Sequence, residues 1–322
     1  MTTPLILPLL LGPATFRFDG GTVFELAKKL DNGTGVVISV NSNLKVKAFE
    51  FKYSDQKDFD RLLAVKSGLR RLGPGGYAAR GYPLHVTEPP RFRSQGGPMR
   101  QVFAWDSEWP FEEVGEKWKV TNKKDEPLRL GRFPLAGKSL KMPPFFERLE
   151  VVVTSGTYEP KSLATKIAAA LGGKLRAAGG GFEISPNLAE VRRRFRETFD
   201  EKLASVKPTD VKSQYNIATI EFSREMFGVA PDSAIEKLLD NENSSDFTIP
   251  KYANLLTAVR NRAIAYSKLP GYATLSPSMP LQPANFLQAA DWDRPAMASL
   301  YSWPLKAGLI VWVKDKNEQM AF

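Results

Sequence analysis

Residues 15–40, TFRFDGGTVFELAKKLDNGTGVVISV, predict a strand, a helix and a second strand in close succession. The first four residues alternate polar and aromatic side chains, as a half-buried strand does. Thr22 and Glu25 have the spacing of a helix capping box, and apolar residues recur behind them at helical spacing. Asn32-Gly33 ends this helix, and the β-branched run Val36–Val40 indicates a buried strand.

The next forty residues extend this pattern. Val46–Tyr53 alternates about one aromatic face, which predicts a further strand. Ser54 or Asp55 can begin a second helix, which Gly73–Gly76 ends, and Tyr77–Arg80 then returns as an edge strand. The apolar side of this second helix is expected to carry Phe59, Leu62, Leu63 and Leu69. The element order is therefore β-α-β-β-α-β.

This order resembles the short N-terminal (STN-like) domain shared by secretins and TonB-dependent receptors, over residues 15–80 only. The positions that carry the resemblance are Phe16, Gly21, Leu26, Leu30, Thr34-Gly35 and Val36–Val40. It implies a periplasmic docking and signalling module that presents a small sheet and helix surface to a protein partner and performs no chemistry. It also implies a periplasmic or extracytoplasmic location, with the cytoplasm as the alternative. The rest of the chain departs from both families and leaves the function of the whole protein open.

The chain as a whole predicts an α+β protein with four segments. Residues 1–14 resemble a weak signal segment, because a short apolar run precedes the small residues Gly12-Pro13-Ala14 but no Lys or Arg precedes Arg17. The STN-like module then covers residues 15–86, and a β-rich segment rich in Pro and Gly covers residues 87–148. A second α/β unit with a helical C-terminal part covers residues 149–322, and whether it repeats the first module stays open.

Local signals within the second unit predict its elements. A strand at Val151–Thr154 is followed by a helix that Pro160 opens. A hairpin surrounds Gly179–Gly181, and helices follow at Leu188–Leu203, Pro231–Asp240 and Pro250–Lys268. Arg192, Arg193, Arg194 and Arg196 are expected to flank the first of these helices. Residues 270–304 read as a Pro-rich loop, Leu309–Val313 as a strand, and residues 314–322 as a frayed tail.

Composition removes several classes of chemistry. The 322 residues contain no Cys and a single His, His85, so disulfides, thiolate metal sites, Cys nucleophiles and multi-His zinc sites are excluded. We expect no cofactor, no metal and no catalytic residue, although the sequence leaves enzymatic activity open. No apolar run is long enough to predict a transmembrane helix.

Positive charge is concentrated in one stretch of the chain, which carries a net charge of +10. Between Arg61 and Arg100, Glu88 is the one acidic residue among many basic ones. Such a stretch favours an anionic partner, such as nucleic acid or another anionic polymer, or it is a solvated surface. The candidate residues for this anionic-partner surface are Arg61, Arg70, Arg71, Arg80, Arg91, Arg93 and Arg100.

Acidic and aromatic residues alternate just after this stretch. Paired carboxylates between aromatic platforms are what glycan binding or hydrolysis requires, and the same composition is typical of a Trp-anchored loop. The candidate residues are Trp105, Asp106, Glu108, Trp109 and Glu112. The resemblance to STN-like domains implies that the whole chain is a non-catalytic envelope protein for protein–protein docking or scaffolding. The alternatives are a nucleic-acid-binding protein that uses Arg61–Arg100 and a glycan binder or hydrolase around Trp105–Glu113.

Overall fold

The computed structural model describes residues 13–40, 45–79, 81–82, 111–122, 127–130, 140–240, 245–249, 255–269, 295–301, 305–312 and 319–321. Helices and mixed sheets both occur in it, which confirms the predicted α+β class. The chain divides into two compact units. Unit 1 comprises Met1–Ala79, Pro110–Leu128 and Glu150–Ala170, and unit 2 comprises Arg80–Trp109, Arg129–Leu149 and Leu171–Phe322. Each unit is assembled from three separate segments and does not follow the linear division expected from the sequence.

The first elements of unit 1 contain the predicted β-α-β-β-α-β order together with three additional strands, and the strand predicted at Val46–Tyr53 is divided into two that belong to different sheets. The elements are β1 (Ala14–Phe18), β2 (Gly21–Thr22), α1 (Val23–Leu30), β3 (Val37–Val40), β4 (Lys45–Val46), β5 (Phe49–Tyr53), α2 (Gln56–Ser67), β6 (Leu69–Gly73) and β7 (Gly76–Ala79). The predicted capping box is confirmed: the Glu25 amide donates to Thr22 Oγ1 at 3.2 Å, and the Thr22 amide donates to Glu25 Oε2 at 2.6 Å. Asp55 caps α2 by accepting from the Asp58 amide at 2.8 Å.

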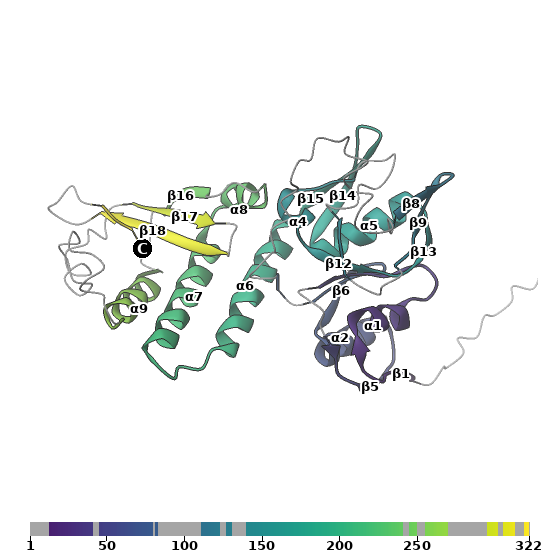
Figure 1. Cartoon of the computed structure of the whole chain (residues 1–322), viewed down its shortest axis with the longest axis horizontal. Coiled ribbons are helices and arrows are strands. Elements are labelled where there is room, and N and C mark those ends of the chain that lie inside the picture. Colours follow the sequence, from purple (N-terminus) through teal and green to yellow (C-terminus); the bar gives the residue numbers. More distant parts are fainter. Residues whose placement is uncertain are drawn as a thin grey trace, which may run out of the picture. The chain divides into compact units, whose positions relative to one another are not determined.

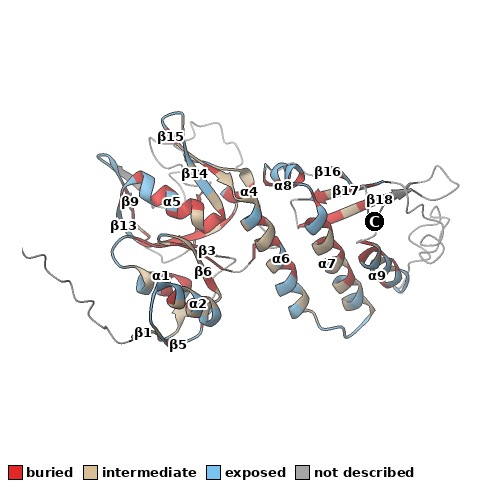
Figure 2. Ribbon diagram, turned by 180° about the vertical axis from the view of Figure 1, so that it is seen from behind, coloured by how far each residue is buried: buried red, intermediate tan, exposed pale blue. Residues whose placement is uncertain are grey.

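Helices α1 and α2 lie between two sheets, as both views show (Figure 1, Figure 2). On one side is the antiparallel pair β1–β5, and on the other is a five-stranded sheet of order β10-β12-β3-β7-β6. Strands β3 and β7 are parallel, and Val37, Ile38 and Ala78 in them have no exposed surface. This arrangement buries the apolar stripe of each helix against apolar side chains of the neighbouring strands.

Later segments of the chain complete unit 1. They supply β8 (Phe111–Val114), β9 (Lys117–Val120), β10 (Leu128–Arg129), β12 (Glu150–Val153), β13 (Gly156–Tyr158) and α5 (Pro160–Leu171). Strand β12 pairs antiparallel with β3, from Glu150 opposite Val40 to Val153 opposite Val37. Helix α5 covers β7, since a Cβ added at Gly76 would lie 2.8 Å from the Ala169 Cβ. The helix begins at Pro160, as predicted.

Unit 2 contains two further sheets and most of the long helices. Its elements are β11 (Leu140–Lys141), α4 (Pro144–Glu147), β14 (Gly173–Ala178), β15 (Gly181–Pro186), α6 (Leu188–Ser205), α7 (Val211–Val229), α8 (Asp232–Leu239), β16 (Ser245–Ile249), α9 (Leu256–Ser267), β17 (Ala296–Tyr301), β18 (Lys306–Trp312) and β19 (Gln319–Ala321). One sheet has the order β11-β15-β14, and the other has the order β16-β17-β18-β19 and contacts α7 and α8. The predicted hairpin around Gly179–Gly181 is confirmed as β14–β15.

Several predicted boundaries in unit 1 were wrong. Helix α2 ends at Ser67 because Gly68 adopts a left-handed conformation with φ 75°, so Leu69 belongs to β6 and not to the helix. The stretch Gly73–Gly76 joins β6 to β7 and does not end a helix. Strand β7 lies between β3 and β6, so it is an interior strand and not an edge.

In unit 2, three predictions were incomplete or wrong. Helix α7 and strand β16 were not predicted at all. Strand β17 lies entirely within residues 270–304, which were expected to be a loop, and β19 lies within the tail expected to be frayed. Helix α7 has no continuous apolar stripe along its length: its large buried residues Phe222, Met226 and Phe227 all lie in the second half. The residue that indicates where α7 begins is Asp210, which forms a capping box with Ser213.

Candidate docking surface

The β1–β5 pair is a ribbon whose inner face is aromatic. Phe16 lies opposite Phe51 and Phe18 opposite Phe49 in the antiparallel register. Phe59 of α2 packs edge-on against Phe16, with ring centroids 5.3 Å apart, and also contacts Tyr53 at 4.9 Å. Aromatic pairs of this kind contribute roughly 0.5–1.5 kcal/mol each beyond their buried area. These contacts hold the ribbon against α2.

The outer face of the ribbon is polar, and its β1 edge is open. Thr15 and Arg17 are exposed, and Arg17 Nε donates to Asp19 Oδ1 at 2.8 Å. Asp19 first and then Glu50 raise the pKa of Arg17 above its ordinary value, so the guanidinium stays charged. Among the described strands β1 pairs with β5 alone, so the other side of β1 presents unpaired main-chain groups. Phe16 remains half-buried beside this edge.

In the five-stranded sheet of unit 1, the strand edges are filled or interrupted. The free side of β3 is occupied by β12 from the same chain. Strand β6 lies at one end of the five-stranded sheet and contains a bulge between Arg71 and Gly73, and β10 at the other end has two residues. Bulges and very short strands are the usual means by which proteins prevent pairing at an edge. The five-residue edge of β1 has neither feature.

Three of the predicted anionic-partner residues lie in the described part of the chain. On α2, Arg61 Nη2 donates to Asp58 Oδ1 at 2.7 Å, and this bond lowers the pKa of the Asp58 carboxyl. Arg71 Nη1 lies 3.6 Å from Asp60 Oδ2. Arg70 and Arg71 are neighbours on β6 and therefore point to opposite faces of the sheet. Acidic residues thus offset part of the positive charge, and Arg70 and Arg71 do not share one face.

The remaining predicted site residues are not described. Four arginines of the anionic-partner surface lie outside the described residues, namely Arg80, Arg91, Arg93 and Arg100. The same holds for His85 and for the acidic and aromatic candidates Trp105, Asp106, Glu108 and Trp109. Glu112 lies in β8, but its side chain is not described. The nucleic-acid and glycan hypotheses therefore stay predictions.

A buried polar cluster around Asp31 was not predicted from the sequence. Asp31 Oδ1 accepts from the amides of Gly33 at 2.9 Å and Gly35 at 2.8 Å, and Asp31 Oδ2 accepts from the Thr154 hydroxyl at 2.7 Å. The Val36 amide donates to Thr154 Oγ1 at 2.9 Å. The loop between α1 and β3 is thereby joined to the end of β12. Asn32-Gly33 indicated only the end of a helix, so no local signal pointed to this cluster.

Lys166 of α5 closes the same cluster. Its Nζ donates to the Thr34 carbonyl and lies 5.8 Å from the centroid of the Tyr158 ring. Burial lowers the pKa of Lys166, although Asp31 opposes this change. Burial also raises the pKa of Tyr158, whose hydroxyl donates to the Thr154 carbonyl at 2.5 Å. Lys166 and Tyr158 thus both donate to main-chain carbonyls of unit 1. The Lys166 bond connects segments of the unit that are distant in the sequence.

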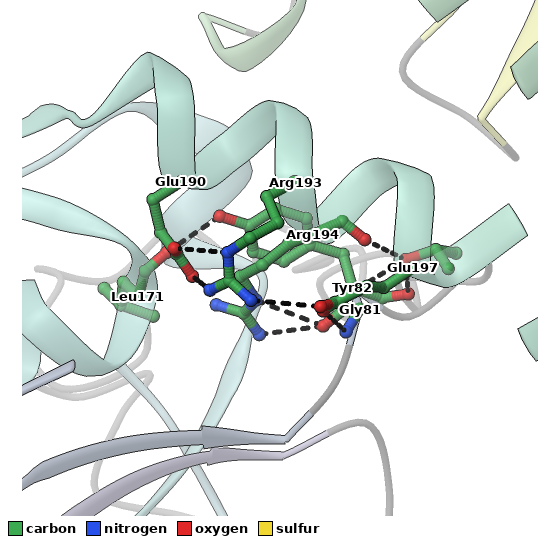
Figure 3. A network of polar contacts seen from close by, with 8 residues as sticks. Gly81, Tyr82, Leu171, Glu190, Arg193, Arg194 and Glu197 are labelled. Atoms are coloured by element: carbon green, nitrogen blue, oxygen red, sulfur yellow. Dashed lines mark hydrogen bonds and ion pairs between the residues drawn. The ribbon is translucent and has the colours of Figure 1, made fainter. Parts of the chain in front are cut away.

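A second buried polar network in unit 2 surrounds Arg194 of α6 (Figure 3). Arg194 has no exposed surface, which corrects the expectation that it flanks the helix. Its Nε and Nη2 donate to the Gly81 carbonyl at 3.2 and 2.9 Å, and its guanidinium stacks 3.9 Å from the Tyr82 ring centroid. Thr198 Oγ1 accepts from the Tyr82 amide at 2.5 Å. The network fastens residues 81–82 to α6.

Further contacts satisfy the polar groups around Tyr82. Its hydroxyl donates to the Leu171 carbonyl at 2.9 Å, and burial raises the pKa of Tyr82 to about 12. On the adjacent face of α6, Arg193 bonds to Glu190 and to Glu197, the latter at 3.0 Å (Figure 3). The four arginines of α6 were visible in the sequence, but helical spacing alone did not show which of them is buried.

Within the part of the chain that the structure describes, no group of three or more His, Cys, Asp or Glu side chains could hold a metal ion. None of the described helices is both long and apolar enough to cross a membrane.

Comparisons with known proteins add no family. No protein-family model, no curated protein and no solved structure matches the chain. The geometry of the chain itself is therefore the basis for any statement about its function.

Proposed function

We propose that this is a non-catalytic docking protein of the cell envelope, which binds a partner protein by adding a strand of that partner to the open edge of β1. The observation that carries the proposal is this regular five-residue edge, with the half-buried ring of Phe16 beside it. Strand addition draws affinity from main-chain hydrogen bonds and specificity from alternate side chains. A partner strand with apolar residues on one face would cover Phe16, and polar residues on its other face would lie beside Thr15 and Arg17.

The resemblance to STN-like domains supports the same role and the envelope location. The two buried polar clusters support a non-catalytic role, because Asp31, Lys166, Arg194 and Tyr82 all bond to main-chain or side-chain groups of their own unit. Polar groups bonded in this way to their own unit stabilise its fold.

Site-specific photo-crosslinking in native cells tests the docking edge. A photoreactive amino acid at Thr15 is expected to capture a partner protein, whereas the same group at Lys161, which is exposed on α5 of the same unit, is not. A proline on β1 should then abolish the capture, because it removes an outward main-chain donor. Adjacent amides of a strand face opposite sides, so Ala14→Pro and Thr15→Pro are both made, and the variant that keeps the native circular dichroism is used.

Two outcomes would contradict the proposal. Equal capture from Thr15 and Lys161 would show that the edge is not selective, and capture that survives the folded proline variant would show that strand pairing is not involved. Location is tested separately by fractionating the cells and reading the N-terminal peptide by mass spectrometry. A chain cut near Ala14 and found outside the cytoplasm supports an envelope protein, and an intact N-terminus in the cytosol opposes it.

A further inference from the structure

Unit 2 contains a second open strand edge, at β14. The strand has six residues and pairs with β15 on one side, and within the described part of the chain it is the last strand of its sheet (Figure 1). Lys174, Arg176 and Ala177 are exposed along it. It contains no proline, and its register with β15 runs without interruption from Gly173 to Ala178. Strands with these properties are templates for pairing with another chain.

The hairpin geometry shows which main-chain groups face the open side. Gly179 and Gly180 have φ of 51° and 81°, as in the two-residue type I′ turn that closes on a hydrogen-bonded pair, here Ala178 and Gly181. Hydrogen-bonded and non-bonded pairs alternate along an antiparallel ladder. Lys174, Arg176 and Ala178 therefore bond to β15, and the main-chain groups of Gly173, Leu175 and Ala177 face outward.

Two independent observations agree with this assignment. Gly173 lies opposite Pro186, which has no amide proton, so that pair cannot exchange both ladder bonds. The Ser185 hydroxyl donates to the Lys174 carbonyl at 3.3 Å, which places that carbonyl on the β15 side.

The polar face of this sheet is positively charged. Lys141 of β11, Glu183 of β15 and Arg176 of β14 form one cross-strand row, and Lys174 lies on the same face two residues from Arg176. Glu183 bonds to Arg176 at 2.5 Å, and the side chain of Arg176 is still 62% exposed. Three cations thus accompany one carboxylate on this face of the sheet, and two of them, Lys174 and Arg176, lie on the edge strand itself.

We propose that the β14 edge is a second docking site, which takes an extended segment of a partner protein with acidic side chains at alternate positions. Its main chain pairs with Leu175 and Ala177, and its carboxylates lie beside Lys174 and Arg176. A second copy of this chain fits less well. Antiparallel pairing of two β14 strands about Leu175 would place Lys174 opposite Arg176 of the other copy, and like charges directly opposite destabilise a sheet.

A synthetic peptide of alternating glutamate and valine tests the proposal on the full chain. We expect it to bind, as measured by fluorescence anisotropy, more tightly than a peptide of alternating lysine and valine, and to bind less tightly as salt is added. Ala177→Pro removes an outward donor and leaves the β15 ladder intact, so it should weaken binding by about tenfold. Arg176→Glu should weaken binding of the acidic peptide and strengthen binding of the basic peptide.

Arg196→Glu is the matched control, because Arg196 is exposed on α6 and carries the same change of charge. It should leave the affinity within about twofold of the original value. Equal binding of the two peptides, or full affinity in a folded Ala177→Pro variant, would overturn the proposal. These variants do not touch β1, so this site and the proposed docking function of unit 1 can fail separately.

Discussion

Arg194 and Tyr82 show how a charged side chain and a phenol can both be accommodated without contact with water. The guanidinium loses its hydration, but two hydrogen bonds to the Gly81 carbonyl and the face of the Tyr82 ring replace part of it. The Tyr82 hydroxyl donates to the Leu171 carbonyl, and it can do so only while it is protonated. Burial therefore links the stability of unit 2 to the protonation of one phenol.

Tyr82 should make the protein lose stability at alkaline pH. Its pKa is raised from 10.0 to about 12 in the folded chain, so the unfolded chain loses its proton first and stability falls as the pH rises from about 10 to about 12. By pH of about 11 the loss should reach about 1.4 kcal/mol. Tyr82→Phe should remove this loss while it costs about 1 kcal/mol near neutral pH through the missing hydrogen bond. Urea unfolding of the original protein and of Tyr82→Phe, near neutral pH and at a pH of about 11, measures the change in the free energy of unfolding.

Tyr301→Phe is the control for this experiment, because Tyr301 is exposed on β17. It should follow the original protein at every pH. An alkaline loss that persists unchanged in Tyr82→Phe would mean that another group controls it.

At the scale of elements, local signals located several helix starts and one hairpin turn, although the Asp210 cap of α7 and the left-handed Gly68 after α2 were not recognised. The capping box at Thr22, the Asp55 cap and the β14–β15 turn are examples. Local signals failed where an element depends on distant partners. Strand β12 was recognised as a strand, but nothing in its sequence indicates that it pairs with β3. The loop between α1 and β3 is another case, because its conformation depends on Thr154 and Tyr158.

Substitutions at Gly33 and Gly35 can measure how far the loop between α1 and β3 depends on its contact with Tyr158. Both have positive φ, 89° and 85°, but a Cβ at Gly33 would meet no atom, whereas one at Gly35 would lie 2.2 Å from Tyr158 Cε1. Gly33→Ala should cost about 1 kcal/mol through backbone strain alone. Gly35→Ala should cost about 3 kcal/mol, because Tyr158 must also move. Denaturant unfolding of the two variants compares them, and equal losses would show that the loop does not pack on β13 as described.

At the scale of the whole molecule, unit 1 is discontinuous in the chain. Strand β12 lies more than a hundred residues after β3, and helix α5 begins at Pro160, long after β7 ends at Ala79. Even so, Val151–Val153 pair with β3 and Ala169 closely approaches Gly76. A module ending near residue 86 therefore lacks β10 and β12, two strands of its five-stranded sheet, and the helix α5 that covers it. Unit 2 is likewise composed of separate segments.

A fragment of residues 13–86 should consequently fold poorly by itself. Without β12 and α5, the apolar residues Val37, Ile38 and Tyr77 lose much of their cover. The fragment should bind a dye that recognises exposed apolar surface, and it should show no near-ultraviolet circular dichroism signal. The full chain should not bind the dye and should show that signal. Cooperative unfolding of the fragment with a native near-ultraviolet spectrum would contradict this expectation.

The amino-acid sequence alone was enough to predict the α+β class, the elements of residues 15–67 and the β14–β15 hairpin, because capping residues, glycines and apolar spacing act within a few positions. It also located the arginine-rich stretch, but charge counting did not reveal that Asp58 and Asp60 offset Arg61 and Arg71. The open edges at β1 and β14, the closure of β3 by β12 and the burial of Arg194 emerged from the fold. These features depend on which strands become neighbours, and that is settled by packing between residues more than a hundred positions apart, such as Val36 and Thr154.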